Sequence, residues 1–185
     1  IDVINKIFLL VTALISGYQV VTGGHGTYQI TIWSYTIGFG TLVISSIVSM
    51  IIGFDTFDKP LVVIISALIP LSISNGLVSQ ISIDMMTSWY LIFSITGFFI
   101  IILTRFLKNK VVANFALSLI HAISGVIILL LPFHLVFSQS YPKYLLFISF
   151  GGIIMGLGGL LIFWDQKEGN ILRRNRKYNF LPGLL

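Results

Sequence analysis

The chain has 185 residues, of which 56% are hydrophobic and only 9% are charged, and its mean hydropathy is +1.01. Soluble domains carry about 25% charged residues, so this composition excludes a water-soluble protein and predicts an all-α integral membrane protein. The net charge of +5 comes from basic clusters beside apolar segments, which fits membrane topology and argues against nucleic-acid binding.

Six apolar segments, each near the roughly 20 residues that a membrane-spanning helix needs, follow one another along the chain. We expect helices over residues 4–22, 30–53, 60–80, 89–106, 111–133 and 143–164. A glycine-rich turn over 23–26 separates the first two helices, and residues 81–88 form the turn before the fourth. We expect Pro70 to kink the third helix and Pro132 to end the fifth.

A short motif of isoleucine, serine and glycine recurs at residues 15–17, 73–76 and 123–125. Each copy lies in an odd-numbered helix and precedes a turn, which favours three antiparallel hairpins of like orientation. Aromatic residues fall near the expected helix ends, as in the interfacial belts of membrane proteins. They are Trp33, Tyr35, Trp89, Tyr90, Tyr141, Tyr144 and Trp164.

Basic residues flank the last two segments, with Arg105, Lys108 and Lys110 before them and five more in the tail. The positive-inside rule places this loop and the tail in the cytoplasm, and six crossings then place the N-terminus there too. We therefore expect a transmembrane domain over 1–164 and a basic cytoplasmic tail with an apolar end over 165–185. The expected location is a prokaryotic plasma membrane, with an organellar membrane as the alternative.

Small and polar residues recur at helical spacing in the predicted helices. They are Ser34, Gly38, Thr41, Ser45 and Ser49; Ser72, Asn75, Gly76 and Ser79; Ser94, Gly97 and Thr104; Asn114, Ser118, His121 and Gly125; and Ser149, Gly152, Gly156 and Gly159. Such residues allow close packing and hydrogen bonding between helices in lipid. We interpret the stripes as the inner seams of a bundle, and the alternative is the lining of a solute path.

His121 is an ionisable residue about ten residues into the fifth helix, near mid-membrane. Asn75, Ser118 and Ser124 are its expected hydrogen-bond partners. A neutral imidazole that ties the fifth helix to the third is the favoured interpretation. The alternative is that His121 relays a proton or contacts a small polar ligand. Because it has no second histidine at matching depth, no haem is expected.

Three residues on the predicted outer face, His25, Asp84 and His134, have side chains of types that bind metals. Their spacing matches no metal-binding motif, so we favour solvated loop residues and expect no metal or other cofactor. In the tail, Arg173, Arg174, Arg176 and Lys177 are candidates for contact with anionic lipid head groups, at about 1 kcal/mol each, or with a partner.

No motif typical of a catalytic site is found in the chain. The predicted function is a non-catalytic subunit within a larger membrane complex, such as a respiratory or other energy-transducing assembly, in contact with lipid and other membrane subunits. The alternative is a small transporter or channel for a small neutral solute, with a path lined by the Ser, Asn and Gly stripes and His121. An enzyme acting on lipid or quinone is a third hypothesis.

Overall fold

The computed structural model describes residues 3–22, 28–53, 60–81, 85–107, 109–139 and 141–167, and their regular structure is entirely helical. The elements are α1 (Val3–Val21), α2 (Gln29–Ile52), α3 (Pro60–Ile81), α4 (Met85–Phe106), α5 (Lys110–Ser138), the 3-10 helix η3 (Lys143–Leu145) and α6 (Leu146–Lys167). The all-α prediction is thus confirmed for the described residues. Helices α1 to α5 are each long and apolar enough to cross a membrane, which indicates a membrane-embedded protein.

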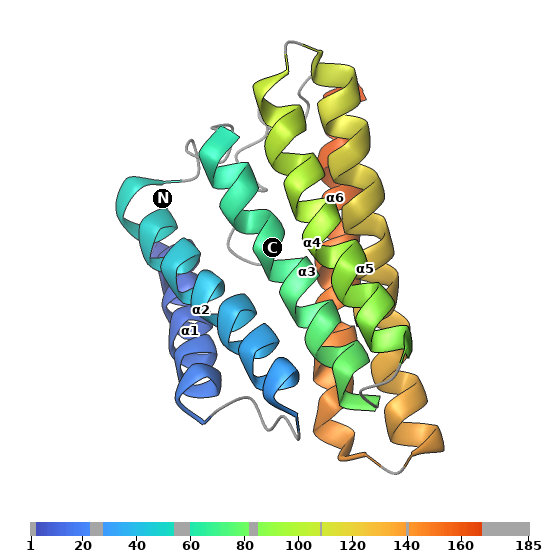
Figure 1. Ribbon diagram of the computed structural model, residues 1–185. Helices are drawn as coiled ribbons and strands as arrows, with labels where there is room; N and C mark the ends of the chain where they lie inside the picture. The colour runs from blue at the N-terminus through green and yellow to red at the C-terminus, as the bar shows by residue number, and fades with distance from the viewer. Residues whose placement is uncertain are drawn as a thin grey trace.

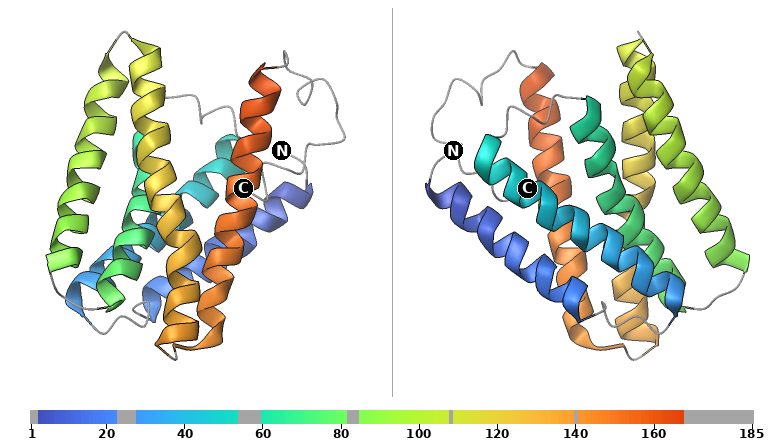
Figure 2. Two further views of the ribbon diagram at one scale, coloured as in Figure 1. Left: turned by 90° about the vertical axis from the view of Figure 1, so that its right-hand side faces the viewer. Right: turned by 60° about the vertical axis from the view of Figure 1, so that its left-hand side comes forward.

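Helix α3 is the centre of the bundle. It packs against α2, α4 and α5, so its neighbours extend beyond its predicted hairpin partner α4. Successive helices run in opposite directions (Figure 1). Helices α1 and α2 lie side by side and cross the others obliquely (Figure 2). The second half of α3 is almost fully enclosed, since every residue from 74 to 80 is buried.

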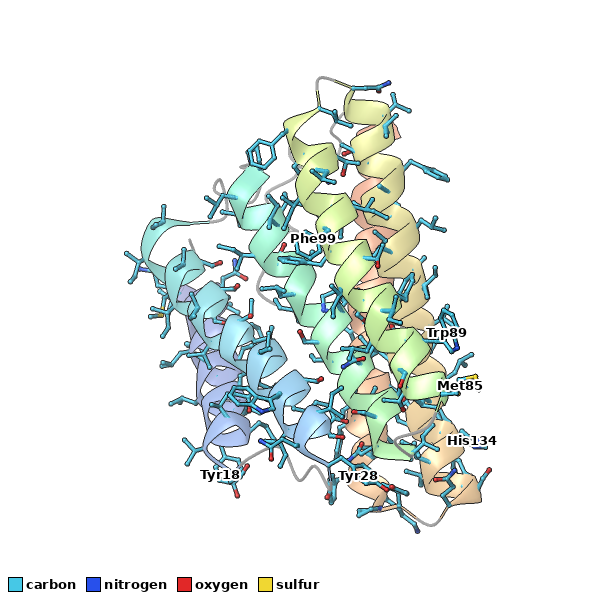
Figure 3. All side chains as sticks on the ribbon, in the orientation of Figure 1. Tyr18, Tyr28, Met85, Trp89, Phe99 and His134 are labelled. Atoms are coloured by element: carbon cyan, nitrogen blue, oxygen red, sulfur yellow. The ribbon has the colours of Figure 1, made fainter. Side chains whose placement is uncertain are left out.

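The bundle exposes apolar side chains and encloses many polar ones, which is the reverse of a protein folded in water. Figure 3 shows Met85, Trp89 and His134 projecting away from the helices. Serine and threonine hydroxyls inside often bond the carbonyl one turn back in the same helix, as Thr41 does to Ile37 at 2.7 Å. This distribution is expected of helices that meet through small polar residues and face lipid elsewhere.

Helix α5 continues five residues beyond its predicted end at 133, so the prediction that Pro132 ends it is wrong. Proline lacks an N–H group and therefore cannot bond the carbonyl of Ile128 one turn back. The Ser149 hydroxyl of α6 donates to that carbonyl oxygen over 3.4 Å. The neighbouring helix supplies the missing donor, which allows the proline within an apolar helix.

Local sequence explains other helix ends. The side chain of Asn109 accepts hydrogen bonds from the backbone N–H groups of Val111 and Val112, at 3.1 and 3.4 Å, and so caps the start of α5. Gly53 follows α2 with a φ of 100°, a conformation that glycine adopts readily. Helix α4 begins at Met85, so the predicted turn over 81–88 is too long by four residues at its C-terminal end.

Candidate functional site

The most polar part of the interior is a cluster of side chains around the C-terminal half of α3, which we call the α3 polar cluster. Its members are Thr31, Ser34 and Tyr35 of α2; Ser74, Asn75, Ser79 and Gln80 of α3; Tyr90 of α4; Ser124 of α5; and Tyr141, just before η3. All of them lie toward the end of the bundle where α3 ends and α4 begins. Four helices therefore contribute polar groups at similar depth.

Three side-chain hydrogen bonds join α2 to α3. Thr31 Oγ1 lies 2.8 Å from Ser79 Oγ, the Tyr35 hydroxyl donates to Gln80 Oε1 at 2.8 Å, and Asn75 Nδ2 donates to Ser34 Oγ at 2.7 Å. All these residues are at least nine-tenths buried, so water does not reach their polar atoms. The hydrogen bonds between the side chains take the place of hydrogen bonds to water. The bonds fix the register between the two helices.

Two glycines allow α2 and α3 to come this close. A Cβ atom at Gly76 would lie 2.5 Å from Cε1 of Tyr35, and one at Gly38 would lie 2.9 Å from Cγ1 of Ile73. Real Cβ atoms do not make such short contacts, so a larger residue would force the helices or the ring apart. Glycine at these positions has a steric role that the predicted packing stripes anticipate.

Tyr90 connects three helices. Its hydroxyl donates to Ser74 Oγ of α3 at 2.8 Å, and its oxygen lies 3.5 Å from Ser124 Oγ of α5. Both serines are fully buried and belong to the repeated isoleucine–serine–glycine motif, whose third serine, Ser16 of α1, is also buried. The motif therefore marks inward-facing positions on α1, α3 and α5.

All three tyrosines of the cluster are predicted to lie in the interfacial belts, and this prediction is wrong for Tyr35, while Tyr90 and Tyr141 are only partly buried. Tyr35 is only 3% exposed, and Tyr141 turns inward to donate to the backbone oxygen of Gln80 at 2.9 Å. The belt rule considers how close an aromatic residue lies to a helix end but not the side of the helix it occupies. Trp33 and Trp89 are exposed, as residues of a belt should be.

One acceptor of the cluster is buried without a hydrogen-bond partner. Asn75 is 3% exposed, and while its Nδ2 donates to Ser34, its Oδ1 has no hydrogen-bond partner among the residues that the structure describes. An amide oxygen can accept two hydrogen bonds, and leaving it unbonded in an apolar interior costs about 1–3 kcal/mol. Asn75 Oδ1 thus has capacity for at least one further donor.

The hydrogen bond of His121 is made within its own helix. Its Nδ1 is 3.1 Å from the carbonyl oxygen of Leu117, one turn back in α5, so this bond does not tie α5 to α3. Asn75 and Ser124 bond Ser34 and Tyr90 instead. Ser118 lies on the exposed side of α5. Among the described residues, none of the three predicted partners is bonded to His121, whose hydrogen bond stays within α5.

The packing stripe predicted for α5 is also wrong in part, since Asn114 and Ser118 are exposed. The buried face instead carries Ala113, Ile120 and Ser124. This face is rotated about the helix axis relative to the predicted stripe. Asn114 accepts a hydrogen bond from Arg105 Nη1 over 3.4 Å at the α4–α5 connection.

In α6, the predicted packing glycines have different surroundings. A Cβ at Gly152 would lie 3.2 Å from Ile128 of α5, whereas one at Gly156 would meet no described atom within 4 Å. The surroundings of Gly159 lie outside the described part of α6. Among the described side chains, the α5–α6 contact is close at Gly152 and open at Gly156.

The remaining predicted sites receive little structural context. His134 is exposed on α5, while His25, Asp84, Arg173, Arg174, Arg176 and Lys177 lie outside the described residues. Within the described ranges, no three histidine, cysteine or acidic side chains form a group suited to a metal ion.

The fold and the α3 polar cluster define a helical membrane protein with a hydrogen-bonded interior. Comparisons of the chain with protein-family models, curated proteins and solved structures found no match.

Proposed function

We propose that the chain is a six-span protein of the cell membrane and a non-catalytic subunit of a larger membrane complex. The supporting observation is the position of α6, which packs against α5 and η3. Helices α5 and α6 meet at one end and diverge toward the other (Figure 2). Along the diverging part, Gly156 has no described neighbour within 4 Å. In lipid, a glycine on such a face allows another helix to approach closely.

The α3 polar cluster fits a structural role in this proposal. Thr31, Tyr35 and Tyr90 use their hydroxyls to bond side chains of neighbouring helices. Interhelical hydrogen bonds in membrane proteins contribute about 0.6 kcal/mol each on average, so several together hold a bundle in one arrangement. A rigid bundle with an open helix face is suited to assembly with other membrane proteins.

The test is extraction in a mild detergent, followed by native sizing and mass spectrometry of the purified particle. We expect other membrane subunits in fixed stoichiometry. Gly156→Leu should release them, because the side chain would hold a neighbouring helix away. Gly40→Leu is the matched control, since Gly40 of α2 also has open space around it. A monomer or homo-oligomer, or equal effects of both variants, would contradict the proposal.

The unbonded acceptor of Asn75 favours a second candidate, a transporter or channel for a small neutral solute with donor groups. In this case the solute would complete the hydrogen bonds of Asn75 Oδ1 as it passes between α2 and α3. Uptake into proteoliposomes tests this candidate. Asn75→Leu should abolish uptake, and Gly40→Ala, at an open position, should leave it unchanged.

A further inference from the structure

An apolar groove runs along the first half of α6, beside α5, on the outside of the bundle. Its volume is about 320 Å³, and it is lined by Phe133, Lys143, Leu146, Phe147, Phe150 and Ile153. Phe147 and Phe150 are 78% and 62% exposed. Five of the six lining residues are apolar, and the sixth is a lysine at the N-terminal end of the α6 segment.

The length of the groove matches one half of a bilayer. Ile153 lies ten positions after Lys143, which corresponds to about 15 Å along a helix. The hydrocarbon core of a membrane is about 30 Å thick, so one leaflet provides roughly the same distance. With α6 crossing the membrane, as the proposed function requires, the lysine lies at the depth of the head groups and the phenylalanines lie at the depth of the acyl chains.

We propose that this groove binds an anionic phospholipid, with its phosphate at the Lys143 ammonium group and one acyl chain along Phe147 and Phe150. The positive charge at the mouth selects the anionic head group, and the apolar wall accommodates the chain. The site lies at the connection between α5 and α6, where the Ser149–Ile128 hydrogen bond also joins the two helices. A lipid bound in the groove covers the outer side of this contact between α5 and α6.

The experiment uses the full chain in nanodiscs that contain equal amounts of phosphatidylglycerol and phosphatidylcholine with identical acyl chains. Lipid retained after transfer to a mild detergent is measured by native mass spectrometry. We expect retained phosphatidylglycerol to exceed phosphatidylcholine, and Lys143→Gln to reduce that preference about fivefold. Lys6→Gln is the matched control, because Lys6 is an exposed lysine on α1, away from the groove.

Two further variants separate lipid binding from folding. Lys143→Arg retains the charge and should retain the preference for phosphatidylglycerol. Phe147→Ser removes part of the apolar wall and should lower retention of both lipids, and the melting temperature in detergent shows whether each variant remains folded. Equal retention of the two lipids by the wild type, or equal effects of Lys143→Gln and Lys6→Gln, would overturn the proposal.

Discussion

The aromatic ring of Tyr35 lies against the backbone of Gly76, so closely that a Cβ atom at Gly76 would be 2.5 Å from Cε1 of the ring. The same tyrosine donates a hydrogen bond to Gln80, one helical turn further along α3. Helix α3 thus holds Tyr35 at two points, by steric fit against the ring and by a hydrogen bond at the hydroxyl. The absence of a side chain at Gly76 leaves room for the Tyr35 ring, and this position of the ring allows the hydroxyl to bond Gln80.

Gly76→Ala should destabilise the protein by about 1–3 kcal/mol, because the buried ring must move and the bond to Gln80 is strained or lost. The measurement is the apparent melting temperature in a mild detergent. Gly40→Ala is the control, since a Cβ there meets no described atom within 4 Å and alanine favours helix. Equal stability of the two variants would show that the contact between Tyr35 and Gly76 is not restrictive.

Tyr35→Phe should lower stability by about 1 kcal/mol, because it leaves the buried Gln80 Oε1 without its donor while preserving the ring. Tyr18→Phe, at an exposed tyrosine of α1, should have little effect. Both are measured as the midpoint of denaturant-induced unfolding in micelles. A similar midpoint for both variants would argue against a stabilising hydrogen bond at Tyr35.

Ser149→Ala should cost about 0.6 kcal/mol in the natural sequence, since the Ile128 carbonyl then loses its donor. In a Pro132→Ala background the same change should cost nearly nothing, because alanine restores the N–H group that bonds Ile128 within α5. A double-mutant cycle of unfolding free energies measures this coupling. Additive effects would show that Ser149 does not compensate for the proline.

The orientation predicted from the basic clusters is testable by single-cysteine labelling, because the 185 residues contain no cysteine. Asn109→Cys, at the α4–α5 connection, should react with a membrane-impermeant maleimide only from the cytoplasmic side. Gln139→Cys, just after α5, should react only from the other side. Labelling of both from one side would contradict the passage of α5 across the membrane.

The sequence predicts the helices well because the apolar content of a membrane segment directly reflects its surroundings. The bounds of α1, α2 and α3 differ from the predicted ones by one residue at each shifted end. Helix α5 was predicted too short because its compensating partner, Ser149, lies in a different helix. Propensity within a single segment does not reveal such a partner.

The polar cluster was only partly predictable, for a related reason. Ser34, Asn75 and Gly76 were identified from helical spacing, and they meet across α2 and α3. The sequence does not identify Tyr35 and Gln80 as members, because an amphipathic tyrosine suits both a membrane surface and a buried hydrogen bond. Only the rotation of each helix about its axis decides between these positions, and that rotation depends on packing.

The cluster joins the helices near one membrane face, whereas toward the opposite face α3, α4 and α5 meet through Ala67, Leu71, Ile101 and Ile120. Lipid tails are as apolar as these side chains, so they compete for such contacts on nearly equal terms. Lipid therefore competes more effectively for the apolar helix contacts near one membrane face than for the hydrogen-bonded contacts near the other. The helices around Ile101 are held together by apolar packing, whereas the helices around Tyr35 and Tyr90 are also held together by hydrogen bonds.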